Sequence, residues 1–115
     1  MSSPQEISLT QWVARLRDPS SLQTRCHLRE AGTRAMCCLG HLGDLIDPDG
    51  WRSNYWRGAR ANLGVHRPSW MSRRQLFDAI HLNDHQRLSL AEIADWAEAG
   101  IPEIEVWLDD SVVPA

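Results

Sequence analysis

Residues 88–100, LSLAEIADWAEAG, contain the signals of a complete amphipathic helix. Ser89 can cap the N-terminus, and Glu92 follows it at the spacing of a capping box. Gly100 is a typical residue to end a helix. The apolar stripe consists of Ile93, Ala94, Trp96 and Ala97. This stretch therefore predicts a short helix that packs one side against a core.

Three further helices are predicted from the same kinds of signal. Apolar residues recur at helical spacing over about residues 8–17 and again over about residues 38–46. The third helix should cover residues 72–84, because Ser72 and Gln75 have the spacing of a second capping box. We expect its apolar face to be formed by Leu76, Phe77 and Ile80.

Two glycines lie within the predicted helix at residues 38–46. Gly40 and Gly43 each cost the helix about 1 kcal/mol relative to alanine. Their presence three residues apart predicts that another backbone approaches this helix closely.

The segments between the helices are less regular. Residues 23–29 and 34–38 alternate loosely in hydropathy around a short interruption, which predicts a β-hairpin. Residues 51–69 are expected to form a long loop with one short element. Residues 104–108 fit either an edge strand or a short helix, and the sequence does not choose between them.

Length and composition indicate one small domain. The chain has 115 residues, of which 43% are hydrophobic, and this is enough to bury a core without disulfides or a structural metal. We expect a helix-rich α+β fold with about four short helices and one small β-hairpin. Three cysteines, two of them adjacent, fit reduced thiols in a cytosol better than a disulfide framework. We expect neither a membrane span nor a secretory signal.

Charge is distributed unevenly along the chain. Residues 51–77 contain six arginines and no acidic residue, whereas residues 78–115 contain nine acidic residues and one arginine. Such a charge asymmetry indicates binding to a partner, or ion pairs between the two segments, and says little about the fold.

The acidic third of the chain is the leading candidate for a partner-binding surface. Glu92, Asp95 and Glu98 recur every three residues and predict a negative ridge on the helix of residues 88–100. Such a ridge could meet a basic surface by charge complementarity. The alternative is an ordinary solvated face. The predicted contact residues are Glu92, Asp95, Glu98, Glu103, Glu105 and Trp107, and Asp84, Asp109 and Asp110 add negative charge.

The arginine- and tryptophan-rich segment 51–74 supports an alternative function. Arginines interleaved with aromatic rings can hold single-stranded nucleic acid by charge and stacking. The favoured interpretation is that the aromatic rings fill the core while the arginines pair with the acidic tail. Among the six tryptophans, we expect Trp12 and Trp96 in the core, and Trp56 and Trp107 at the surface.

A cysteine and histidine group provides a second alternative, a small zinc-binding module. Cys26, Cys37, Cys38 and His41 could together supply four zinc ligands if the hairpin brought them together. The usual paired C-x-x-C is missing, so packing in the core is favoured. No phosphate loop, metalloprotease motif or nucleophile elbow occurs. We therefore expect no catalytic residues, no cofactor and no enzymatic activity.

Two segments of the chain carry a family resemblance. Residues 37–44, CCLGHLGD, fit a CCLG-x-L-x-D motif; residues 82–84, LND, and the later stretch 88–96, LSLAEIADW, fit an LND…S-x-x-EIAD motif. The chain resembles, over about residues 10–98, a large family of small proteins encoded by phages and prophages, mostly without assigned function. It departs from that family at His41 and Gly43. The acidic residues 101–115 look like an extension of the family-like core.

The resemblance implies a phage-type accessory protein that acts in the cytoplasm of a bacterial host. Small proteins of mobile elements often bind and inhibit a host complex, and CRISPR inhibition is one such role. We expect the partner to be a host protein complex with a basic surface that binds nucleic acid. This step rests on analogy with the family.

Overall fold

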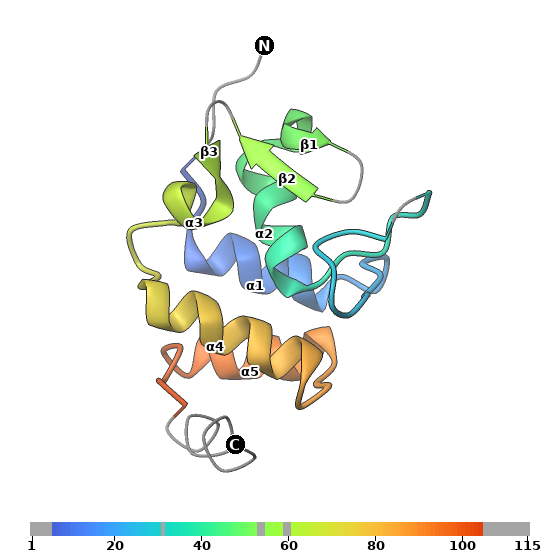
Figure 1. The fold of residues 1–115 in the computed structure, drawn as a ribbon. Coiled ribbons are helices and arrows are strands. Elements are labelled where there is room, and N and C mark those ends of the chain that lie inside the picture. Colours follow the sequence, from blue (N-terminus) through green and yellow to red (C-terminus); the bar gives the residue numbers. More distant parts are fainter. Residues whose placement is uncertain (1–5, 31, 53–54, 59–60, 105–115) are drawn as a thin grey trace, which may run out of the picture.

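Local capping signals set the helix boundaries. The computed structural model describes residues 6–30, 32–52, 55–58 and 61–104. The predicted capping boxes of Ser72 with Gln75 and of Ser89 with Glu92 are both confirmed, and Ser8 forms a third with Gln11. The elements in chain order are α1 (Leu9–Arg17), α2 (Cys38–Ile46), the 3-10 helix η1 (Pro48–Gly50), β1 (Trp51–Arg52), β2 (Tyr55–Gly58), β3 (Ala61–Asn62), α3 (Leu63–His66), α4 (Arg73–Asp84) and α5 (Leu90–Glu98) (Figure 1).

The four predicted helices correspond to α1, α2, α4 and α5, and the helix-rich α+β fold class is confirmed. Helix α2 is central, because it contacts α1, α4 and β2 and is buried along most of its length (Figure 1). Helix α5 packs on α1 through Ile93, Ala94 and Ala97, all without solvent exposure. Trp12 is equally buried and donates from Nε1 to the carbonyl oxygen of Cys38 at 2.9 Å.

The two glycines of α2 lie about one turn apart on the same face, and each allows a neighbour to approach closely. A Cβ atom on Gly40 would lie 2.0 Å from the carbonyl oxygen of Leu28, so the predicted approach of another backbone is confirmed there. A Cβ atom on Gly43 would lie 3.1 Å from the Trp56 ring, so the neighbour at this position is a side chain instead.

The predicted hairpin of residues 23–29 and 34–38 is wrong. Within these segments the pairing is limited to isolated bridges that join Met36 to Gln23 and to Arg29. Cys26 has a φ of 67°, a left-handed conformation that interrupts an extended strand. Backbone groups in this region bond elsewhere: Cys26 N–H, for example, donates to the Asp84 carboxylate at 2.8 Å.

The strands lie instead in the region expected to be a loop. β1, β2 and β3 pair antiparallel in that order, with Trp51 opposite Trp56 and Arg57 opposite Asn62. Trp56 anchors the sheet: it is 2% exposed and donates from Nε1 to the Asp47 carbonyl oxygen at 2.9 Å. The prediction of a surface position for Trp56 is therefore wrong. Strands of two to four residues are too short to be predicted from an alternation of apolar and polar residues.

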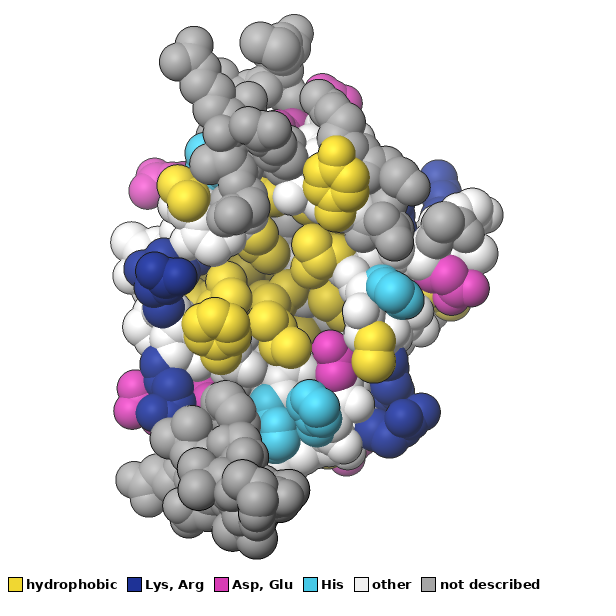
Figure 2. Space-filling view, in the orientation of Figure 1, with side chains coloured by type: hydrophobic (Ala, Val, Ile, Leu, Met, Phe, Trp, Pro, Cys, Tyr) yellow, Lys and Arg dark blue, Asp and Glu magenta, His cyan; other side chains and the backbone are white. Residues whose placement is uncertain are grey.

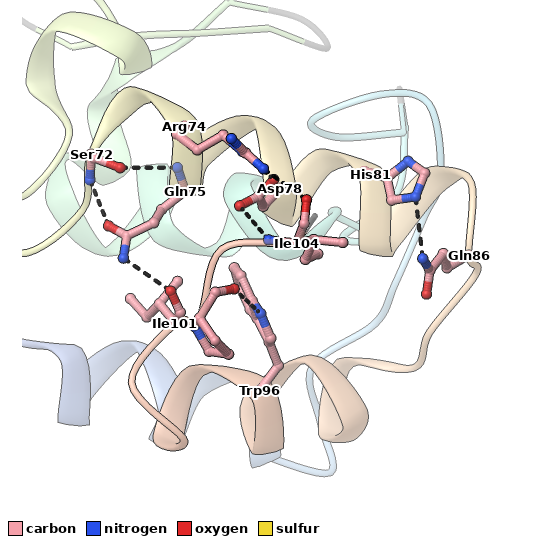
Figure 3. Close-up of polar contacts among 10 residues, drawn as sticks. Ser72, Arg74, Gln75, Asp78, His81, Gln86, Trp96, Ile101 and Ile104 are labelled. Atoms are coloured by element: carbon pink, nitrogen blue, oxygen red, sulfur yellow. Dashed lines mark hydrogen bonds and ion pairs between the residues drawn. The ribbon is translucent and has the colours of Figure 1, made fainter. Parts of the chain in front are cut away.

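The chain after α5 turns back along α4 (Figure 3). Ile101 is buried, Ile104 N–H donates to the Asp78 carboxylate at 3.2 Å, and Arg74 donates to the Ile104 carbonyl oxygen at 2.7 Å. Residues 101–104 form neither helix nor strand, and 105–108 lie outside the described residues. Among the helices that are described, none has the length and apolar character needed to cross a membrane.

Candidate functional site

The exposed side of α5 carries the three carboxylates predicted to form a ridge. The helix is fixed against α1 by its apolar residues, so Glu92, Asp95 and Glu98 all remain exposed. We call these three residues the acidic face of α5. Because the opposite side of the helix is buried, the spacing of these charges is set by the fold.

Glu92 caps the N-terminus of α5 together with Ser89. Its carboxylate accepts a hydrogen bond from Ser89 N–H at 2.9 Å, while Ser89 Oγ accepts from Glu92 N–H at 3.1 Å. A negative charge in the first turn is also favourable to the helix dipole. Glu92 therefore adds charge to the acidic face but cannot be replaced without cost to the helix.

Asp95 and Glu98 share one cation from α1. Arg17 lies 2.8 Å from the Asp95 carboxylate and 2.7 Å from that of Glu98, and these hydrogen bonds raise the pKa of Arg17. The side chains of Asp95 and Glu98 nevertheless remain 70% and 55% exposed. Exposed ion pairs contribute little to stability. With three carboxylates and one guanidinium, the acidic face is partly neutralised but still negative.

The remaining predicted contact residues do not lie on this helix. Glu103 is exposed on the segment that follows α5. Its neighbours in the chain are tethered: the Pro102 carbonyl oxygen accepts a hydrogen bond from Trp96 Nε1, and Ile104 N–H donates to Asp78 of α4. Asp84 lies at the end of α4, where it is partly buried and its carboxylate accepts a hydrogen bond from Cys26 N–H. Trp96 is half-buried rather than a full core residue. The positions outside the described residues are Glu105, Trp107, Asp109 and Asp110.

The structure does not assemble the alternative zinc site. Cys37 and Cys38 are buried, whereas Cys26 is exposed. Burial raises the pKa of Cys37 to about 11 and raises that of Cys38 as well, which disfavours the thiolate needed to bind a metal or attack a substrate. His41 Nε2 lies 2.8 Å from the Leu22 carbonyl oxygen. Within the described part of the chain, no three His, Cys, Asp or Glu residues form a group that could hold a metal ion.

Most aromatic rings of segment 51–74 are buried or form hydrogen bonds within the fold. Trp56 is in the core, Trp70 donates to the Ile7 carbonyl oxygen at 2.8 Å, and Trp51 donates to Asp44 at 2.9 Å. Tyr55 is the aromatic residue of this segment that is largely exposed. Few aromatic rings of this segment are thus left to stack on the bases of a nucleic acid. The side chains of Arg52, Arg57 and Arg60 lie outside the described residues.

The structure exposes apolar side chains that the sequence did not predict at the surface. Figure 2 shows hydrophobic side chains gathered between α4 and the sheet. Phe77 on α4 is 50% exposed, while Asp78 and Asn83 on the opposite side of this helix are fully buried. The assignment of Phe77 to a core-facing stripe is therefore wrong. If Ala79 and Leu82 mark the buried side of α4, a helical wheel places Phe77 on the outer side. This spacing is the feature of the sequence from which the exposure of Phe77 could have been predicted.

Comparisons with family models, with curated proteins and with solved structures gave no match.

Proposed function

We propose that this chain is a non-enzymatic binding protein that attaches to a partner protein through the acidic face of α5. The observation that carries this proposal is the high exposure of Asp95 and Glu98 on a helix whose other side is buried. A fixed array of carboxylates steers a basic partner toward it and sets the register of binding.

The partner is a host protein complex with a basic surface that normally holds nucleic acid. On such a surface the carboxylates take the positions of phosphate groups. Arg17 does not prevent this binding, since an exposed ion pair is weak enough for a guanidinium of the partner to replace it. Binding by this route blocks the nucleic acid without any chemical step.

The biological setting is proposed from the family resemblance of residues 37–44 and 82–96. That resemblance supports a phage-type accessory protein in the cytoplasm of a bacterial host. Inhibition of a host defence complex, with CRISPR inhibition as its most specific form, is the role that suits an acidic protein of this size.

The test reverses the two charges of the acidic face that do not cap α5. Asp95 and Glu98 are replaced together by arginine, while Glu92 is kept because it caps the helix. The matched control is Glu30→Arg, which changes an exposed carboxylate in the loop between α1 and α2. The partner is captured from host extract with the wild-type chain, identified, purified and titrated against each variant.

We expect the double variant to bind at least about tenfold more weakly and the control to bind normally. Both variants should keep the helical circular dichroism of the wild type. Unchanged affinity of the double variant would contradict the proposal. If the wild-type chain captured no protein but retained single-stranded RNA at low salt, segment 51–74 would be supported instead.

A further inference from the structure

Three apolar side chains of α4 share the outer side of that helix. Phe77 is 50% exposed, and Leu76 and Ile80 are only partly buried. Residues three or four apart on a helix are neighbours, so the three side chains form one surface, which we call the apolar side of α4. It belongs to the region between α4 and the sheet where hydrophobic side chains gather (Figure 2). Covering this surface with another segment would be favourable, because it removes apolar area from water.

The chain after α5 crosses α4 toward this apolar side (Figure 3). Gln75 Nε2 donates to the Ile101 carbonyl oxygen at 3.0 Å. Three residues later, the Ile104 carbonyl oxygen accepts from Arg74 at 2.7 Å. With about 3.6 residues per turn, Gln75 and Phe77 lie on opposite sides of Arg74 around the helix axis. The path from Ile101 to Ile104 therefore leads around α4 in the direction of Phe77.

The residues that follow Ile104 have the composition of a segment that covers such a surface. Residues 105–110 are EVWLDD, in which three apolar residues lie between acidic ones. Trp107 comes three residues after Ile104, and an extended chain spans roughly 10 Å over that length. Arg74 and Phe77 are three apart on the helix, which separates their Cβ atoms by about 5–6 Å. The ring of Trp107 can therefore reach that of Phe77 without any change in the described fold.

The charges on α4 also suit this segment. Arg73 is exposed and forms no ion pair with the residues described. On the helical wheel it lies beyond Phe77, on the side away from Arg74. Asp109 and Asp110 follow the apolar residues of the segment, so they would arrive near this guanidinium.

We propose that residues 106–108 of the same chain cover the apolar side of α4, with the Trp107 ring against Phe77 and the carboxylates of Asp109 and Asp110 beside Arg73. Aromatic pairs gain from ring contact in addition to the area that they bury. This gives Trp107 a role different from the partner contact predicted from the sequence. The inference is independent of the acidic face of α5 and does not rest on the proposed function.

The experiment uses the fact that Phe77 is the single phenylalanine of the chain. Incorporation of 4-fluorophenylalanine therefore labels position 77 alone and gives one ¹⁹F NMR signal. Trp107→Ala should shift this signal, because an adjacent indole ring changes the local magnetic field. Leu22→Ala, which removes an exposed apolar side chain from the loop before α2, is the control and should leave the signal in place. An unmoved signal in Trp107→Ala, or an equal shift in both variants, would overturn the proposal.

Two further readouts identify the occupant of the surface. A soluble paramagnetic compound should broaden the ¹⁹F signal more in Trp107→Ala than in the wild type, since the ring of Phe77 becomes accessible. Equal broadening would overturn the proposal. The wild-type signal should not change on dilution, because the contact lies within one chain. A shift on dilution would show that a second copy covers the surface and would overturn the assignment to residues 106–108.

Discussion

Asn83 is a fully buried amide that joins three parts of the chain. Its Oδ1 accepts from Gln23 Nε2 at 2.9 Å and from Cys38 N–H at 3.2 Å. Its Nδ2 donates to the Thr24 carbonyl oxygen at 3.0 Å. One side chain thus satisfies backbone groups at the start of α2 and in the loop before it, which explains how that loop is ordered without a hairpin.

Replacing Asn83 by alanine should destabilise the fold by about 3 kcal/mol, because Cys38 N–H and the Thr24 carbonyl oxygen lose their partners. Urea unfolding followed by circular dichroism measures this change. Gln86→Ala is the control, since its exposed side chain bonds only to His81 among the described residues. A loss below about 0.5 kcal/mol for Asn83→Ala would contradict the role assigned to this amide.

The thiols should differ sharply in reactivity. At pH 8 the native protein should react with a thiol reagent at exposed Cys26 and not at buried Cys37 or Cys38, and all three should react in urea. The pKa of Cys37 rises on folding from 9.0 to about 11, so its protonated form stabilises the fold. That contribution is complete below pH 9 and is lost as the pH rises to about 11. Rapid labelling of Cys37 at pH 8 would be inconsistent with this burial.

At the scale of elements, α2 is positioned by close contacts along one face. Gly40 faces the Leu28 backbone and Gly43, about one turn later on the same face, lies against the Trp56 ring. A backbone carbonyl moves only with its whole segment, whereas a side chain can shift by a few tenths of an ångström. The two glycines therefore differ in how well they tolerate a methyl group.

Gly40→Ala should destabilise the protein by about 3 kcal/mol or more, because its Cβ would overlap the Leu28 carbonyl oxygen. Gly43→Ala should cost about 1 kcal/mol or less, since the gain in helix propensity offsets a contact at 3.1 Å. Thermal unfolding of both variants gives the comparison. A larger loss for Gly43→Ala than for Gly40→Ala would contradict this description of the packing.

The elements that could be predicted from the sequence are those with local signals. Capping boxes lie within four residues, so α4 and α5 were predicted correctly with their start sites. The conformation of residues 23–26 depends on hydrogen bonds to Asn83 and Asp84, which are some 60 residues away and leave no local pattern in the sequence. The short strands could not be predicted, because Trp56 holds them against the core and the sequence alone does not show that its ring is buried.

At the scale of the whole molecule, Arg17 links the first long helix to the last. It pairs with Asp95 and Glu98, which are 78 and 81 residues later in the chain. The spacing of the carboxylates along α5 follows from the sequence, but the arrival of Arg17 beside them depends on how α1 packs on α5. The sequence therefore predicts the spacing of these carboxylates along α5 and does not predict the guanidinium of Arg17 beside them.

The segment after α5 is attached to α4 through a buried carboxylate. Asp78 has no solvent exposure and receives hydrogen bonds from Arg74 Nε at 3.1 Å and from Ile104 N–H at 3.2 Å. Asp78→Ala should cost about 3 kcal/mol, because it leaves Arg74 without its carboxylate and Ile104 N–H without its acceptor. It should also raise the rate of hydrogen exchange at Ile104. Unchanged exchange there would show that Asp78 does not hold this segment.

The measurement that tests the central claim most directly is the affinity of the Arg17→Gln variant for the partner. Removing this exposed cation leaves every carboxylate of the acidic face in place and makes the face more negative. If the face binds a basic surface, Arg17→Gln should bind more tightly than the wild type, and the difference should shrink as salt is added. Weaker or equal binding at low salt would contradict the account.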